Sequence, residues 1–113
     1  MKITHKIALV CMLALSFSLL FAAAKGDAKK GKELFATRCS PCHGEKGEGR
    51  PAVAKMFNVT LKPFAGTEVQ GKTDDQLMKF IVDGNGKMKP VKLSETEAAD
   101  TIAFIRTLAA PKK

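Results

Sequence analysis

The run Cys39-Ser40-Pro41-Cys42-His43 places two thiols with two residues between them and an imidazole directly after the second thiol. A Cys-x-x-Cys-His run is typical of a c-type haem attachment site. Each thiol can add across one haem vinyl group to form a thioether, and the two-residue gap lets one short turn reach both vinyls. The same turn places His43 beneath the iron as its proximal ligand. We therefore predict one covalently attached haem c, tethered through Cys39 and Cys42.

Two other kinds of site use cysteine pairs, namely a zinc site and a redox-active dithiol. Zinc needs four ligands, whereas Cys39, Cys42 and His43 are the only Cys or His residues left once residues 1–24 are removed. A thioredoxin-like dithiol is expected beside a strand-helix-strand unit, and the sequence predicts no such unit. Haem attachment therefore fits the sequence better than either alternative.

Residues 1–24 have the three parts of a secretory signal peptide. Lys2 and Lys6 form the charged start, an apolar run covers 7–21, and alanines at 22–24 supply the small-residue cleavage site. The rival interpretation is an uncleaved membrane anchor, but a spanning helix needs about 20 apolar residues and this run is shorter. We predict cleavage, so that residues 25–113 form one exported, periplasmic domain without stable membrane insertion.

The chain that remains after cleavage is basic. The full sequence has 19 basic and 11 acidic side chains, and removal of Lys2 and Lys6 leaves 17 basic ones and a net charge near +6. This balance favours docking to acidic surfaces of redox partners or to anionic membranes. Lys46, Lys87 and Lys89 could place that charge around the haem edge, although scattered lysines would also serve solubility. Nucleic-acid binding is not predicted, because the chain is expected to be exported and carries no nucleic-acid-binding motif.

Three helices account for most of the chain after the signal, so the predicted fold class is all-α. The first is expected over 28–38, behind Asp27 as its N-cap. The other two each open with a capping box, in which a Thr or Ser and a Gln or Glu three residues later bond each other's backbone N–H groups. These pairs are Thr73 with Gln76 and Ser94 with Glu97. Gly84 ends the second helix and Pro111 follows the third.

Two loops connect the motif to the second helix. Three glycines and a proline indicate a loop over 44–51, followed by a helical turn over 52–57 and an irregular stretch over 58–71. Apolar side chains available to line a haem pocket are Phe57, Val59, Leu61 and Phe64. A metal-bound imidazole usually donates its other N–H to a carbonyl or carboxylate. We expect the Pro51 carbonyl to accept this bond from His43, unless Pro51 serves only to form a turn.

A sixth iron ligand has to be another residue type, because His43 is the only histidine outside the signal. Methionine thioether is the other strong ligand of haem iron in electron transfer. Met78 lies in the second predicted helix, and Met56 lies thirteen residues beyond His43, a short reach around the haem edge. Met88 lies in a Gly/Pro loop over 84–90 that can hold an unusual backbone conformation against the haem. We predict Met88 as the axial ligand, with lysine as the remaining alternative.

With these features the chain resembles a small bacterial class I cytochrome c over essentially its full length after the signal. In that family Cys-x-x-Cys-His lies near the start, and an axial methionine lies in a Gly/Pro loop before the last helix. In members of this family the first helix also packs across the last one, with a glycine and an aromatic residue at the contact. Gly31, Phe35 and Cys39 reproduce that spacing, and Phe104 resembles the aromatic residue of the final helix. The resemblance implies three main helices and loops wrapped around one covalently attached haem.

The resemblance and the site chemistry together imply an exported one-electron carrier, not an enzyme. Its haem iron would cycle between Fe(III) and Fe(II), with His43 and Met88 filling both axial positions and leaving no place for a substrate. Soft thioether ligation favours the reduced iron. The competing class is a haem-based ligand-binding or sensor protein, or a peroxidase-like domain, in which Met88 is displaced or never bound. No distal His or Arg is placed convincingly enough in the sequence to favour that class.

Overall fold

The structure, a computed structural model, describes residues 26–111, so the predicted signal peptide over 1–24 lies outside the described residues. In order along the chain, the helices are α2 (Ala28–Arg38), α3 (Ser40–His43), α4 (Pro51–Phe57), α5 (Thr67–Gln70), α6 (Asp74–Asp83) and α7 (Glu95–Thr107). Extended pairing within residues 26–111 is limited to one bridge between Asn85 and Met88. The all-α prediction is confirmed. No helix in this part of the chain has the length and hydropathy needed to span a bilayer.

The three main helices, α2, α6 and α7, begin where the capping signals predict. The Asp27 side chain accepts bonds from the backbone N–H groups of Lys29 and Lys30, at 2.9 and 3.3 Å. Both capping boxes have both of their hydrogen bonds. The side chain of the N-cap residue accepts from the backbone N–H three residues later, and the side chain of that later residue accepts from the backbone N–H of the N-cap. Local hydrogen bonding at the N-terminus therefore fixes where each of these helices starts.

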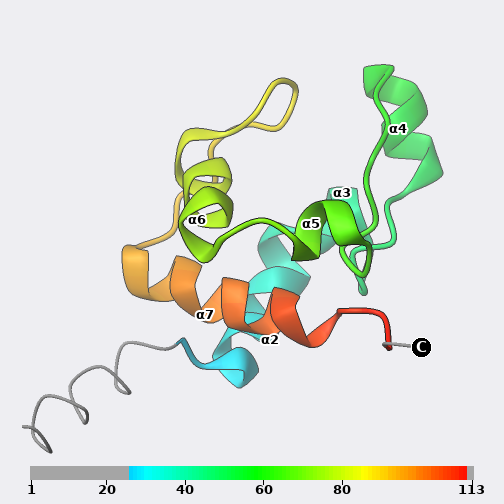
Figure 1. The fold of residues 1–113 in the computed structure, drawn as a ribbon. Helices are drawn as coiled ribbons and strands as arrows, with labels where there is room; N and C mark the ends of the chain where they lie inside the picture. The colour runs from blue at the N-terminus through cyan, green and yellow to red at the C-terminus, as the bar shows by residue number, and fades with distance from the viewer. Residues whose placement is uncertain (1–25, 112–113) are drawn as a thin grey trace, which may run out of the picture.

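The centre of the fold is the crossing of α2 over α7 (Figure 1). Gly31 allows the two backbones to approach closely, because a Cβ there would overlap the carbonyl oxygen of Asp100. One turn later, Phe35 is 1% exposed and packs edge-on against Phe104, with ring centroids 5.1 Å apart. The Asp100 carboxylate also accepts a bond from the backbone N–H of Asp27 at 2.7 Å. The predicted glycine and aromatic contacts of the crossing are thus confirmed.

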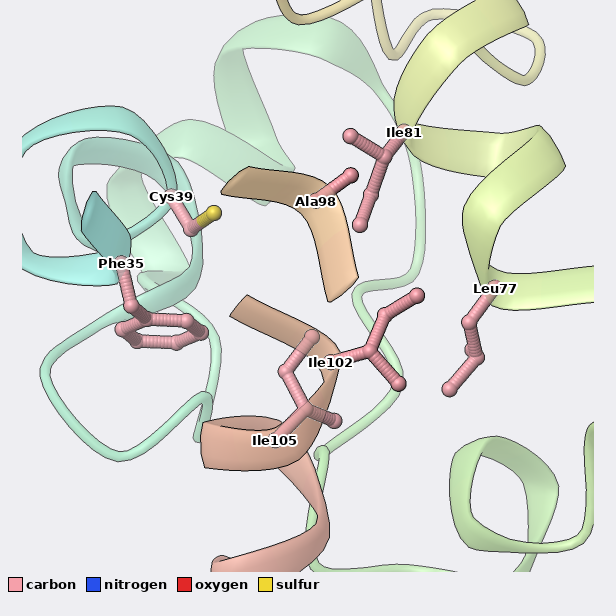
Figure 2. Close-up of a cluster of buried hydrophobic side chains, with 7 residues drawn as sticks. All are labelled: Phe35, Cys39, Leu77, Ile81, Ala98, Ile102 and Ile105. Atoms are coloured by element: carbon pink, nitrogen blue, oxygen red, sulfur yellow. The ribbon is translucent and has the colours of Figure 1, made fainter. Parts of the chain in front are cut away.

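The hydrophobic core spreads from this crossing toward α6 (Figure 2). Its buried members are Phe35, Cys39, Leu77, Ile81, Ala98, Ile102 and Ile105. Apart from Cys39, which lies between α2 and α3, they come from α2, α6 and α7, and Met78 and Phe80 pack against them while partly buried. Cys39 belongs to this core, so the start of the haem motif is anchored directly to the helix crossing.

The segment between residues 64 and 74 is tied to α7 by polar side chains. Gln70 Nε2 donates to the carbonyl oxygens of Phe64 at 2.7 Å and Ile105 at 2.9 Å. Arg106 donates to the carbonyl oxygens of Gln70 and Lys72 and forms an ion pair with Asp74. This segment was predicted to be irregular up to residue 71, whereas it contains the four-residue helix α5. The difference arises because two residues of α7, distant in sequence, hold the turn: Arg106 through its side chain and Ile105 through its backbone carbonyl.

Candidate haem site

The short helix α3 presents all three reactive groups of the motif. Cys39 is its N-cap, and Cys42 and His43 lie in its single turn. The backbone N–H of His43 donates to the Cys39 carbonyl at 2.9 Å. Gly44 ends α3 with a φ of 83°, a conformation that favours glycine. Cys39 is buried and Cys42 exposed, with both thiols free. Burial, together with the neighbouring Cys42, raises the pKa of Cys39 to about 11, so this thiol is neutral at pH 7.

An apolar cavity of about 390 Å³ lies beside α3. That volume is within the roughly 300–1,000 Å³ usual for cofactor and ligand sites. His43 and Met88 both line it, together with apolar side chains of the predicted pocket, Val59, Leu61 and Phe64. An apolar cavity with an imidazole and a thioether in its wall suits a flat, largely apolar haem.

The prediction that Phe57 lines the pocket is wrong. Phe57 is 43% exposed at the end of α4 and does not line the cavity. Helix α4 buries none of its residues and stands away from the α2–α7 crossing in Figure 1. Asn58 ends α4 in the left-handed conformation, with a φ of 52°, and thereby turns the chain. Val59 and Leu61 therefore reach the cavity after this turn, while Phe57 stays outside.

The loop after α6 presents Met88 to the cavity. Asn85 and Met88 exchange backbone hydrogen bonds, each 2.9 Å long, across a tight turn that contains Gly86 at a φ of 57°. A Cβ at Gly84 would lie 2.6 Å from the Met88 carbonyl oxygen and 2.9 Å from Pro90, so only glycine fits there without a shift. The Val91 N–H then donates to the Ile81 carbonyl at 2.8 Å, which returns the loop to α6.

The three candidate methionines lie in different surroundings. Met56 is 74% exposed on α4, Met78 packs against the core, and Met88 is the one of the three that lines the cavity. The placement favours Met88 as the axial ligand, a role that stays a prediction.

The imidazole of His43 lacks the hydrogen bond expected for it. Its Nδ1 is buried and has no hydrogen-bond partner among the described residues. The predicted bond to Pro51 is therefore wrong for this structure, because Pro51 occupies the first turn of α4, where its fixed φ favours helix initiation. The imidazole ring instead packs against Phe64, with centroids 4.8 Å apart. Burial lowers the pKa of His43, which favours the neutral ring that binds metals.

The alternative uses of the cysteine pair find no support in the described part of the chain. Residues 26–111 contain no group of three or more His, Cys, Asp or Glu side chains arranged to hold a metal ion. The strand-helix-strand unit expected around a thioredoxin-like dithiol is missing from the same residues.

Lysines are prominent around the cavity, and one of those that line it, Lys72, was not predicted from the sequence. Lys62, Lys72 and Lys87 contribute to its wall. Lys72 Nζ lies 5.4 Å from the centroid of the Phe80 ring and forms a cation–π pair with it. Phe80 also lines the cavity. The predicted docking lysines, Lys46, Lys87 and Lys89, are all exposed. No local pattern marks Lys72, because its position follows from the bonds that hold the α5 segment against α7.

Comparison with known proteins establishes the class of this chain. The family model for cytochrome c matches residues 28–109, from the start of α2 to just beyond the end of α7. The chain belongs to the cytochrome c family. As a member of this family it carries a covalently bound c-type haem, and Cys39 and Cys42 have the spacing of the family's attachment motif.

Individual relatives are bacterial cytochromes. The chain is 34% identical over 95 residues to the cbb3-type cytochrome c oxidase subunit FixP of Azorhizobium caulinodans, covering 79% of this chain and 31% of FixP. It is 36% identical over 92 residues to cytochrome c-L of Methylorubrum extorquens, covering 79% of this chain and 44% of that protein. The chain thus spans less than half the length of these two relatives.

A relative of similar size and a solved structure agree on the fold. Cytochrome c-554(547) of Halothiobacillus neapolitanus is 29% identical over 89 residues, which cover 74% of this chain and 98% of that protein. The solved structure of the KustC0563 c-type cytochrome superposes with a TM-score of 0.61 at 23% identity, over 71% of this chain and 98% of the other. The predicted class I cytochrome c fold is confirmed.

Proposed function

We propose that this protein is an exported one-electron carrier that exchanges electrons with other redox proteins and is not itself an enzyme. The observation that carries the proposal is the apolar cavity lined by both His43 and Met88, beside the cysteine pair of α3. When bound, the haem supplies the Fe(III)/Fe(II) couple. The chain supplies a tether, two axial ligands and a low-dielectric surrounding.

Each residue of the site has a distinct role in this proposal. Cys39 and Cys42 would hold the cofactor through thioethers, while His43 and Met88 would bind its iron. With both residues bound to the iron, no coordination site would be left open for a substrate. The Met88 sulfur favours the reduced iron and raises the potential. Because FixP is named as an oxidase subunit, an oxidase complex is one kind of partner that the likeness supports.

An absorption spectrum of the haem-loaded protein tests the function. We expect a weak band at the red end of the visible range in the ferric state, typical of His/Met ligation, and no binding of carbon monoxide by the ferrous state at neutral pH. A spectrum without that band, together with immediate carbon monoxide binding, would favour the ligand-binding or peroxidase-like alternative. Colourless protein made with active haem-attachment machinery would contradict both functions.

Positive charge beside the cavity supports docking to acidic partners. Lys87 lies in the cavity wall and is exposed, and Lys89 follows it one residue beyond Met88. We expect electron exchange with a redox protein of net negative charge to slow as ionic strength rises, because salt screens the attraction. Lys87→Glu with Lys89→Glu should flatten this salt dependence in stopped-flow measurements. The control, Lys29→Glu with Lys32→Glu on exposed positions of α2, changes the net charge equally, and an equal effect would rule out a localised docking surface.

A further inference from the structure

The charged side chains in the cavity wall all carry the same sign. Lys62, Lys72 and Lys87 line the cavity, whereas no Asp or Glu of residues 26–111 does. A cation beside an apolar surface loses hydration, which costs free energy unless an anion compensates it. The c-type haem of this family has both chemistries, because its porphyrin is apolar and its two propionate groups are carboxylates. The wall of this cavity suits both parts of the cofactor.

Lys72 differs from the other two lysines in how it is held at the wall. It is half-buried, and its Nζ lies 5.4 Å from the centroid of the Phe80 ring. A lysine placed in this way keeps its methylene stem against apolar surface and leaves its ammonium donors for an anion. Lys62 is instead exposed and forms an ion pair with Glu68 at 3.3 Å, and Lys87 is exposed.

We propose that Lys72 binds a haem propionate, and that Arg106 of α7 positions Lys72 for this contact. The inference rests on the proposed function, because it takes the haem to occupy this cavity. The ammonium can donate charge-assisted hydrogen bonds to the carboxylate. The propionates leave the porphyrin at the edge opposite its vinyl groups, so their partners are expected away from the cysteine pair of α3. Lys72 meets this condition, because it comes from the connection between α5 and α6.

Arg106 holds the backbone of Lys72 in place. Its Nη1 donates to the Gln70 carbonyl at 3.0 Å, and its Nη2 donates to the Lys72 carbonyl at 2.6 Å. The same guanidinium pairs with Asp74 at 2.7 Å, so one rigid fork binds acceptors on both sides of Lys72 and on Lys72 itself. The Lys72 N–H donates to the Val69 carbonyl at 3.1 Å. Both backbone polar groups of Lys72 are therefore engaged, which fixes the point from which its side chain enters the cavity wall.

A cation bound to a propionate affects the iron. Ferric haem carries one more positive charge than ferrous haem, so a nearby cation favours Fe(II). The effect is larger at a half-buried position than at an exposed one, because water screens the interaction less. Lys72 therefore acts in the same direction as the Met88 thioether and raises the reduction potential.

Replacement of Lys72 in haem-loaded protein tests the contact. Lys72→Met keeps an unbranched stem and removes the charge, Lys72→Arg keeps the charge, and the control Lys79→Met removes an exposed lysine of α6 that lies outside the cavity wall. We expect Lys72→Met to lower the midpoint potential and to shift the propionate bending band of the resonance Raman spectrum, which reports hydrogen bonding to the carboxylates. Lys72→Arg should restore both readouts toward wild type, and Lys79→Met should leave the band unshifted.

A double-mutant cycle tests the positioning role of Arg106. Arg106→Met should shift the propionate band in the wild-type background and cause no further shift in the Lys72→Met background, because Arg106 acts on the propionate through Lys72. A merely structural role would lower the unfolding temperature in both backgrounds and leave the band in place. That result, or an equal band shift in both backgrounds, would contradict the positioning role.

A wild-type potential and a wild-type band in Lys72→Met would overturn the inference, and so would an equal band shift in Lys62→Met. If Lys72→Met yields no haem-loaded protein, Lys72→Gln takes its place, since it loses the charge and keeps an amide donor. Its potential must still fall, and a wild-type potential would overturn the inference. Failure of the proposed function has a different signature, namely wild-type protein without the His/Met band, because the propionate band does not depend on the sixth ligand.

Discussion

Replacing both Cys39 and Cys42 with alanine is expected to abolish covalent haem attachment. The two thioethers are the only bonds from the chain to the porphyrin in the proposed site, so a protein without either sulfur can hold the cofactor only through axial ligation and packing. Acidic organic solvent, which protonates His43 and unfolds the cavity, should then extract all of the haem. Each single replacement leaves one thioether and should give partial retention. Retention of covalent haem in the double variant would contradict the assignment.

Intact mass spectrometry measures this result and the predicted export together. Wild-type protein should have the mass of a chain that begins at or near Lys25 plus one haem, and the double variant the mass of the polypeptide alone. Cys11→Ala is the matched control, because Cys11 lies within the predicted signal and its replacement should leave the mature mass unchanged. A mature mass that changes in Cys11→Ala would show that residues 1–24 are retained, as an uncleaved anchor requires.

The parts of the fold that were predicted correctly from the sequence are those fixed by hydrogen bonds and backbone conformations within a few residues along the chain. Asp27 marks the start of α2 because its side chain bonds N–H groups two and three residues away. The capping boxes at Thr73 and Ser94 fix α6 and α7 in the same way. The Met88 loop is also local, since Gly84 and Gly86 adopt positive φ and the turn closes over four residues.

The parts that sequence did not predict depend on contacts between distant segments. Helix α5 is too short to show apolar periodicity, and it is held by Arg106, which lies 36 residues from its partner Gln70. The Pro51 prediction was wrong because a proline that opens a helix and one that offers its carbonyl to a ligand look the same in sequence. The contact of Phe64 with His43 has no sequence signal either, since Phe64 was one of several apolar candidates for the cavity wall.

Met88→His is expected to keep the iron low-spin and to lower its reduction potential markedly. Imidazole nitrogen is a harder donor than thioether and favours the ferric state, so exchange of the sixth ligand should move the potential while Cys39 and Cys42 still hold the haem. Met56→Leu and Met78→Leu are matched controls, because Met56 is exposed and Met78 packs in the core, away from the cavity. Met78→Leu conserves volume and should cost less than about 1.5 kcal/mol of stability.

The deciding measurement is the methyl resonance of the bound methionine in the ferrous protein, which the haem ring current shifts far upfield. This resonance should vanish in Met88→His and persist in both controls. Survival of the signal in Met88→His and its loss in Met56→Leu would mean that α4 folds over the cavity when haem is bound. That outcome would also explain why two apolar residues of α4, Met56 and Phe57, are exposed in this structure. The placement of Met88 in the cavity wall, on a loop built around Gly84 and Gly86, is the physical reason to expect the opposite.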